Sequence, residues 1–231
     1  MRILMVGADR MEFTGILEHA RSARGTTVRV DWSREAELSG NTVLLAANGA
    51  GAKRAAAAVD ASLDQFPADA ILSTGFCGAL SPKLSVADIV EATGVSDGVR
   101  CLPVLPVASD RTYHRGLLVS IDHVAQTAAE KRLLHDGGGF AVEMEAREVA
   151  ARAAYRRVPF YCVRVVSDLA SEDMANDFNA ALRDDGHFDT MSILRGTLRN
   201  PLVRLPELLR LRSRCARAAR VLGEFIADCR Y

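Results

Sequence analysis

Two stretches of this chain, AVEMEA at residues 141–146 and VRVVSDLA at residues 163–170, decide how it is expected to fold. The first places two glutamates around a methionine, at what we expect to be the start of a helix. The second is typical of an apolar strand that ends in polar residues, among them Arg164, Ser167 and Asp168. Open α/β sheets bind ligands at the carboxyl ends of their strands. The sequence therefore predicts a ligand site where this strand ends.

The hydrophobic pattern of the rest of the chain predicts alternating strands and helices. We expect strands at 2–6, 27–32, 42–46, 70–74, 89–92, 117–120 and 140–142, and helices from the first strand to about 22, at 52–65 and at about 124–134. Such alternation favours a layered α/β fold. A length of 231 residues suits a single domain over 1–231.

Composition excludes several classes of protein. The chain is 49% hydrophobic and 25% charged, and 29 basic residues balance 29 acidic ones. A formal net charge of zero gives no global field to attract nucleic acid, so no nucleic-acid partner is expected. The apolar run at the N-terminus is too short for a signal peptide, and we expect a cytoplasmic protein without a membrane span. Five scattered cysteines without a C-x-x-C spacing argue against a metal site and against a disulfide framework.

The C-terminal segment, about 201–230, has apolar residues three and four positions apart, which predicts an amphipathic helix lying on the core. Arginines fill the positions between them. A solvated arginine face is the simpler interpretation. Contact with a membrane surface or another anionic partner is the alternative.

Together with two upstream segments, RILMVGADRMEF at 2–13 and STGFCGALSPKLSVADIV at 73–90, these motifs resemble the nucleoside phosphorylase and nucleosidase superfamily. The resemblance covers about residues 1–184 and is closest to the methylthioadenosine/S-adenosylhomocysteine nucleosidase branch. It implies a three-layer α/β/α sandwich around a central mixed β-sheet. It also implies a small-molecule nucleoside as partner, a homo-oligomer that is a dimer, and no metal or organic cofactor. Inorganic phosphate would be a co-substrate only in a phosphorylase.

Cleavage of an N-glycosidic bond makes the departing purine basic, so a proton donor lowers the barrier. The resemblance assigns this role to Asp168, with Ser167 beside it, and donation near neutrality requires a pKa raised by burial or by nearby carboxylates. The alternative is that Asp168 only caps a helix after Ala170. Glu12 occupies the position of the carboxylate that activates water in the nucleosidases. Its alternative role is that of a solvated residue early in a helix.

The remaining candidates are substrate-binding residues. Glu145 can accept hydrogen bonds from two vicinal ribose hydroxyls, and Met144 can pack against the sugar. Glu143 is expected either to contact the sugar or to serve only as a helix-start carboxylate. The other members of the expected set are Arg164, which could orient the water or Glu12, Ser167, Gly75, Phe76 and Val124.

Three departures from the nucleosidase pattern affect the expected substrate. Phe76 stands where a small hydroxyl residue is usual, the 93–115 segment is short, and IDHVAQ at 121–126 replaces the usual purine loop, with His123 more typical of a surface position. The short segment predicts an open 5′ side. We expect hydrolysis because of Glu12. Phosphorolysis, including that of hopanoid-associated members of the superfamily, which act on adenosine attached to a lipid, is one alternative, and a non-catalytic nucleoside-binding relative is another.

Overall fold

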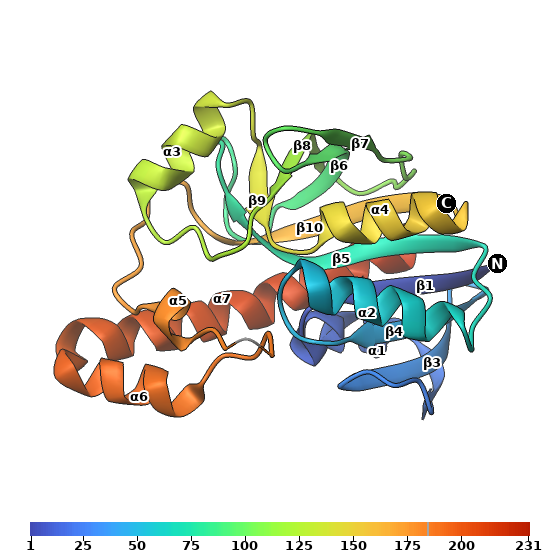
Figure 1. Cartoon of the computed structure of the whole chain (residues 1–231), viewed down its shortest axis with the longest axis horizontal. Helices are drawn as coiled ribbons and strands as arrows, with labels where there is room; N and C mark the ends of the chain where they lie inside the picture. Colours follow the sequence, from blue (N-terminus) through green and yellow to red (C-terminus); the bar gives the residue numbers. More distant parts are fainter. Residues whose placement is uncertain (184) are drawn as a thin grey trace.

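The computed structural model describes residues 1–183 and 185–231. Within them, a ten-stranded mixed sheet is covered by helices on both faces (Figure 1). The strands are β1 (Arg2–Gly7), β2 (Arg21–Gly25), β3 (Trp32–Leu38), β4 (Asn41–Ala47), β5 (Ala70–Ala79), β6 (Ile89–Ser96), β7 (Cys101–Pro103), β8 (His114–Ser120), β9 (Ala141–Glu143) and β10 (Phe160–Asp168). The helices are η1 (Arg10–Phe13), α1 (Thr14–His19), α2 (Ala52–Leu63), α3 (Ala128–Asp136), α4 (Ala146–Arg156), α5 (Phe178–Ala181), α6 (Thr190–Arg199) and α7 (Pro201–Asp228).

The strand pairings bring the carboxyl ends of three strands together. β1 is parallel to both β4 and β5, and β5 is parallel to β10. β5 also pairs with β10 and with β9. Since β10 pairs with β6, β6 with β8, and β8 with β9, these five strands form a closed ring. Because parallel strands end at the same edge, the segments that follow β1, β5 and β10 can share one site.

Both faces of the central strands of the sheet are buried, and successive side chains of such a strand enter different cores. Leu4 and Val6 of β1 pack in the core that α2 and α4 cover, whereas Ile3 and Met5 pack in the core that α1 and α7 cover. This arrangement confirms the three-layer α/β/α sandwich with a central mixed sheet. Helices α1 and α7 touch backbone to backbone, because a Cβ atom on Gly15 would lie 2.0 Å from the carbonyl oxygen of Ala219.

The expected elements near the N-terminus need correction. Residues 27–31 of the predicted strand at 27–32 belong to the connection between β2 and β3, and Trp32 begins β3. The predicted helix ends at His19 because residue 21 already begins β2. Val28 is buried and Val30 packs against the same core. Apolar side chains can alternate into a core without strand-to-strand hydrogen bonds, and this is why the alternating pattern resembles that of a strand.

The segment after β10 contradicts the alternative in which Asp168 only caps a helix after Ala170. Asp168 is the last residue of β10, and the next helix, α5, begins at Phe178 with Asp177 as its N-cap. The amphipathic helix predicted at 201–230 is α7, and its residues Cys215, Ala218 and Leu222 are buried. Of the described helices, none is both long and apolar enough to cross a membrane.

Candidate active site

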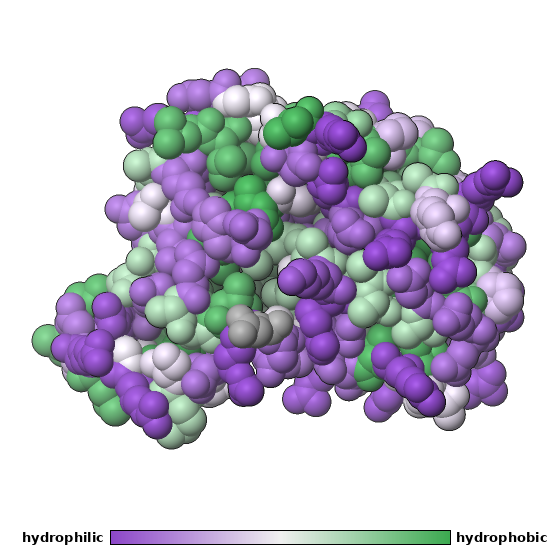
Figure 2. Space-filling model, in the orientation of Figure 1, coloured by the Kyte–Doolittle hydropathy of each residue, from purple (hydrophilic) through white to green (hydrophobic). Residues whose placement is uncertain are grey.

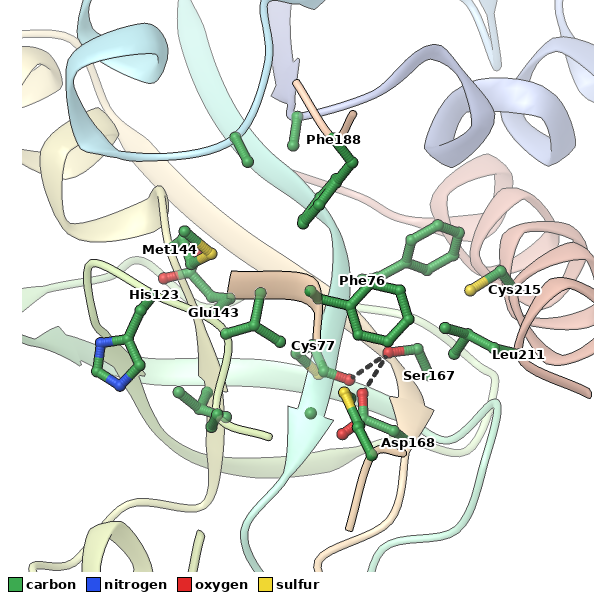
Figure 3. Close-up of a pocket in the computed structure, with 18 of the residues that line it drawn as sticks. Phe76, Cys77, His123, Glu143, Met144, Ser167, Asp168, Phe188, Leu211 and Cys215 are labelled. Atoms are coloured by element: carbon green, nitrogen blue, oxygen red, sulfur yellow. Dashed lines mark hydrogen bonds between the residues drawn. The ribbon is translucent and has the colours of Figure 1, made fainter. Parts of the chain in front are cut away.

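A cavity of ≈ 370 Å³ lies where β1, β5, β9 and β10 end (Figure 3). Eight of the ten predicted site residues line it: Glu12, Phe76, Val124, Glu143, Met144, Glu145, Ser167 and Asp168. Gly75 and Arg164 lie outside the lining, directly behind two of its carboxylates. The predicted residues come from five separated segments, so the fold alone brings them together.

Glu12 is held at the floor of the cavity by backbone amides. Asp9 caps η1 and forms a capping box with Glu12, and the Glu12 carboxylate accepts hydrogen bonds from the N–H groups of Ala8 (2.7 Å) and Phe76 (2.8 Å). Gly75 has a φ of +140°, and a Cβ atom there would lie 2.3 Å from Glu12 Oε1. Gly75 is therefore required both by its backbone conformation and by the approach of this carboxylate. Burial raises the pKa of Glu12, and the charge of Arg164 opposes this only in part.

Glu143 and Arg164 form a buried ion pair at one side of the cavity. Arg164 is 1% exposed, and its Nη2 donates to Glu143 Oε2 (2.6 Å) and to Ser73 Oγ (2.8 Å). The same Glu143 oxygen accepts from the N–H groups of Glu145 and Ala146 at the start of α4. Glu143 therefore acts as a helix-start carboxylate and as the counter-ion of Arg164, while it also borders the cavity. Arg164 makes no hydrogen bond to Glu12 among the described contacts, so its orienting role stays a prediction.

Glu145 has more freedom than Glu143 to bind a ligand. Its Oε1 accepts from the N–H of Gly51 (2.8 Å), and its Oε2 lies 3.8 Å from Arg164 Nη1. Burial, followed by the charge of Glu143, raises the pKa of Glu145. Met144, between the two glutamates, turns its thioether toward the cavity (Figure 3). Met144 and Glu145 are thus placed to meet the same ligand.

Asp168 lies on the opposite side, paired with a residue that the sequence did not reveal. Lys131 of α3 is 0% exposed, and its Nζ donates to Asp168 Oδ2 (2.5 Å) and to the carbonyl of Leu169 (2.8 Å). The Ser167 hydroxyl lies 2.7 Å from the other Asp168 oxygen and 3.2 Å from the carbonyl of Cys77 (Figure 3). The partner of Asp168 is therefore an ammonium group and not a second carboxylate.

The loop before α3 presents Val124 to the cavity with both of its backbone groups already bonded. The Val124 N–H donates to Asn179 Oδ1 (2.7 Å), and its carbonyl accepts from Asn179 Nδ2 (3.0 Å). His123, beside it, also borders the cavity and lies between Asp122 (2.7 Å) and Glu130 (2.5 Å). Hydrogen bonds to Asp122 and then to Glu130 raise the pKa of His123.

Lys131 and the apolar wall of the cavity are the features of this site that the sequence motifs missed. The wall consists of Met11, Met174, Phe178, Phe188, Ile193, Leu211 and Cys215. Most of these residues follow β10, beyond the motifs. One feature of the sequence could have identified Lys131. It lies three residues from Ala128 and from Leu134, and so it shares their apolar helix face.

The lining is acidic, and the two compensating cations are buried behind it. Glu12, Glu143, Glu145 and Asp168 line the cavity, and neither arginine nor lysine is among the described residues that do. A site of this kind stabilises positive charge that develops on a bound ligand. It also holds a carboxylate, Glu12, that can take a proton, and a carboxyl group, Asp168, whose position an ammonium group fixes.

The family model described as the phosphorylase superfamily matches residues 2–107 and 105–188. The chain belongs to this superfamily. Among curated relatives, a 5′-methylthioadenosine/S-adenosylhomocysteine nucleosidase from Anoxybacillus flavithermus is 26% identical over 213 residues, which cover 79% of this chain and 92% of the relative. The enzyme of the same name from Staphylococcus aureus is 28% identical over 174 residues, 63% of this chain and 76% of the relative.

Solved structures of low identity share the fold. S-adenosylhomocysteine nucleosidase from Streptococcus pyogenes, in complex with 5-methylthiotubericidin, superposes with a TM-score of 0.75 at 16% identity and covers 99% of this chain and 95% of its own. Futalosine hydrolase of Helicobacter pylori gives a TM-score of 0.74 at 16% identity, over 99% and 96% of the two chains.

Proposed function

We propose that this protein hydrolyses the N-glycosidic bond of a purine nucleoside of the adenosine type that carries a 5′ substituent. One observation carries the proposal: Glu12, a buried carboxylate held by backbone amides, shares a cavity with Asp168. The curated relatives, named as methylthioadenosine/S-adenosylhomocysteine nucleosidases, support the same reaction.

The residues divide the reaction between the two sides of the cavity. Glu145 accepts hydrogen bonds from the ribose hydroxyls, and Met144 packs against the sugar. Asp168 delivers a proton to the departing purine, while Ser167 and Lys131 hold its carboxyl group in place. Glu12 takes a proton from the attacking water, and the surrounding carboxylates stabilise the positive charge that develops on the sugar.

Phosphorolysis is the competing reaction, and the electrostatics of the cavity favour water. Phosphate is bound in proteins by arginine, lysine and free backbone N–H groups. The described lining has neither cationic residue, Arg10 is exposed outside it, and the N–H groups of Ala8 and Phe76 already donate to Glu12. An incoming phosphate would also face four acidic side chains.

The apolar wall favours an apolar 5′ substituent. Phe188, Ile193 and Leu211 extend the cavity with hydrophobic surface, and Phe76 adds its ring on the side of β5 (Figure 3). A methylthio group uses part of this wall, whereas a larger lipid-like group uses more of it, so a lipid-linked adenosine is the second candidate substrate.

We also propose the domain organisation, the oligomeric state, the location and the cofactor requirement of the protein. The chain acts as one domain over residues 1–231, as a homodimer in the cytoplasm, with no metal, organic cofactor or nucleic acid. The resemblance to the nucleosidases supports the dimer and the absence of a cofactor, and the zero net charge supports the absence of nucleic acid. Light scattering tests the dimer, and activity retained after dialysis against EDTA tests the absence of a metal.

The deciding experiment is product analysis with a nucleoside panel, with and without phosphate. The panel contains adenosine, inosine, methylthioadenosine, S-adenosylhomocysteine and adenosines with 5′-alkyl chains of increasing length. Free sugar and base without phosphate support the hydrolase. Sugar 1-phosphate formed only with phosphate identifies a phosphorylase, and binding without product identifies a non-catalytic relative.

A further inference from the structure

Two neighbouring helices, α6 and α7, present apolar stripes to solvent at the end of the molecule that projects farthest from the sheet (Figure 1). Of the 14 large hydrophobic side chains that are exposed among the described residues, eight lie between Phe188 and Leu209. Six of them form the surface that we call the hairpin face: Met191, Leu194 and Leu198 of α6, and Leu202, Leu205 and Leu209 of α7. Each set follows the spacing i, i+3, i+7, which places it on one side of its helix.

The inward sides of the same helices are fixed by hydrogen bonds. Glu207 is buried and accepts from the N–H groups of Ala175 (2.7 Å) and Asn176 (2.8 Å). Arg204 Nη1 donates to the carbonyl of Gly196 (2.6 Å), which joins α7 to α6. The hairpin face is therefore the outer side of an anchored structure, and Leu202 on it is 88% exposed.

Positive charge lies beside the hairpin face. Residues 190–220 contain eight arginines and one acidic residue, the buried Glu207, although the whole chain has a net charge of zero. Of these arginines, Arg204 is turned inward to Gly196 and Arg214 pairs with Glu172. Arg195 lies four positions after Met191, and Arg212 lies three positions after Leu209, so both flank the stripes. Figure 2 shows hydrophobic and hydrophilic surface side by side at this projecting end.

We propose that the hairpin face is a docking surface for an anionic lipid bilayer, in whose interface it lies without crossing the membrane. Apolar side chains that enter the acyl boundary, surrounded by arginines that meet anionic headgroups, are the pattern of an interfacial helix. A second copy of this chain is a poorer occupant. In a two-fold interface the same arginines would face one another, with no exposed acidic residue of 190–220 to oppose them. The inference does not depend on the reaction proposed above.

The hairpin face and the apolar wall of the cavity share two helices. Ile193 of α6 and Leu211 of α7 line the cavity. Docking would therefore hold the apolar wall of the cavity next to the bilayer interface.

Vesicle flotation with the full chain tests the proposal. We expect the protein to float with vesicles of phosphatidylcholine containing phosphatidylglycerol, to bind pure phosphatidylcholine at least about tenfold more weakly, and to lose binding at high salt. The variant Leu198→Ser/Leu202→Ser/Leu205→Ser/Leu209→Ser should lose binding. Its matched control, Val99→Ser/Leu105→Ser/Leu133→Ser/Tyr155→Ser, removes four exposed hydrophobic residues elsewhere and should bind like the wild type.

Charge and insertion are tested separately. Arg195→Gln/Arg199→Gln/Arg212→Gln should weaken binding to anionic vesicles about tenfold or more, whereas Arg21→Gln/Arg29→Gln/Arg132→Gln, three exposed arginines outside the hairpin, should not. A tryptophan placed by Leu202→Trp should shift its emission to the blue on binding, and one placed by Leu133→Trp should not.

The proposal is overturned if the wild type does not float with anionic vesicles. It is also overturned if the serine variant binds normally, or if that variant changes only the oligomeric state measured by light scattering.

Discussion

The two ends of the cavity hold their charges in opposite ways. At the end assigned to the sugar, three acidic side chains, Glu12, Glu143 and Glu145, lie around the single guanidinium of Arg164. Burial raises the pKa of Glu12 and of Glu145. At the end assigned to the base, Asp168 and Lys131 form a balanced pair. A group of acidic side chains suits a sugar that becomes cationic, whereas one carboxyl group held in place by Lys131 suits the exchange of one proton with the base. The comparison predicts that the two ends respond differently to substitution.

The largest effect is expected at Glu12, on the sugar end. Glu12→Gln removes the base that activates water, and we expect phosphate-independent base release to fall by about 10⁴-fold, the upper end of the range for general acid–base catalysis. Quantifying free purine by chromatography measures the loss. Near-normal hydrolysis would remove Glu12 from the mechanism, and with it one of the two reasons for preferring water over phosphate.

The pH profile provides an independent check of the same residue. Burial raises the pKa of Glu12, and a general base works only when ionised. Activity should therefore rise with pH through this raised pKa, so that the acid limb of kcat/KM lies above the usual range of glutamate, about 4.3. The raised pKa also means that the folded state binds this proton more tightly than the unfolded chain does, so ionisation of Glu12 at higher pH lowers stability. An acid limb within the ordinary glutamate range would contradict the assignment.

On the base end, Asp168→Asn should lower kcat by about 10²- to 10⁴-fold while substrate still binds. The sharper readout is the leaving group. A ribosyl substrate whose leaving group departs without a proton should lose far less activity in this variant than a purine nucleoside does. Equal losses on both substrates would show that Asp168 positions the nucleoside and does not protonate it.

The sequence motifs predicted what lies within short stretches of chain, and missed what depends on contacts between distant ones. Glu143 and Glu145 were identified because a strand end and a helix start are consecutive, and Ser167 and Asp168 because they end an apolar strand. Lys131 was missed because its partner lies 37 residues later, and a lysine in a helix usually faces solvent. The same applies to 27–32, where an alternating pattern could not distinguish a strand from a connection packed on the core.

Lys131 is expected to have an intermediate effect. Lys131→Met removes the charged hydrogen bond to Asp168, a bond of about 1.5–3 kcal/mol, which corresponds to roughly 10- to 100-fold in kcat with little change in KM. Lys131→Arg should restore part of the activity. Lys83→Met, at an exposed lysine, is the control. If Lys131 acts through Asp168, Lys131→Met should have almost no further effect in an Asp168→Asn background, and additive losses in this double-mutant cycle would contradict that link.

The smallest effect is expected at Asn179, which bonds both backbone groups of Val124. If those groups are to receive the edge of a purine, the Asn179 amide competes with the base for them. Asn179→Ala removes two neutral hydrogen bonds, each of about 0.5–1.5 kcal/mol, and should lower KM by roughly fivefold with kcat unchanged. Asn179→Asp keeps the acceptor for the Val124 N–H and loses the donor to its carbonyl, so its KM should fall between those of the wild type and the alanine variant. A KM that rises in Asn179→Ala would mean that Asn179 holds the Val124 loop in its binding conformation. The contact would then support binding of the base and would not compete with it.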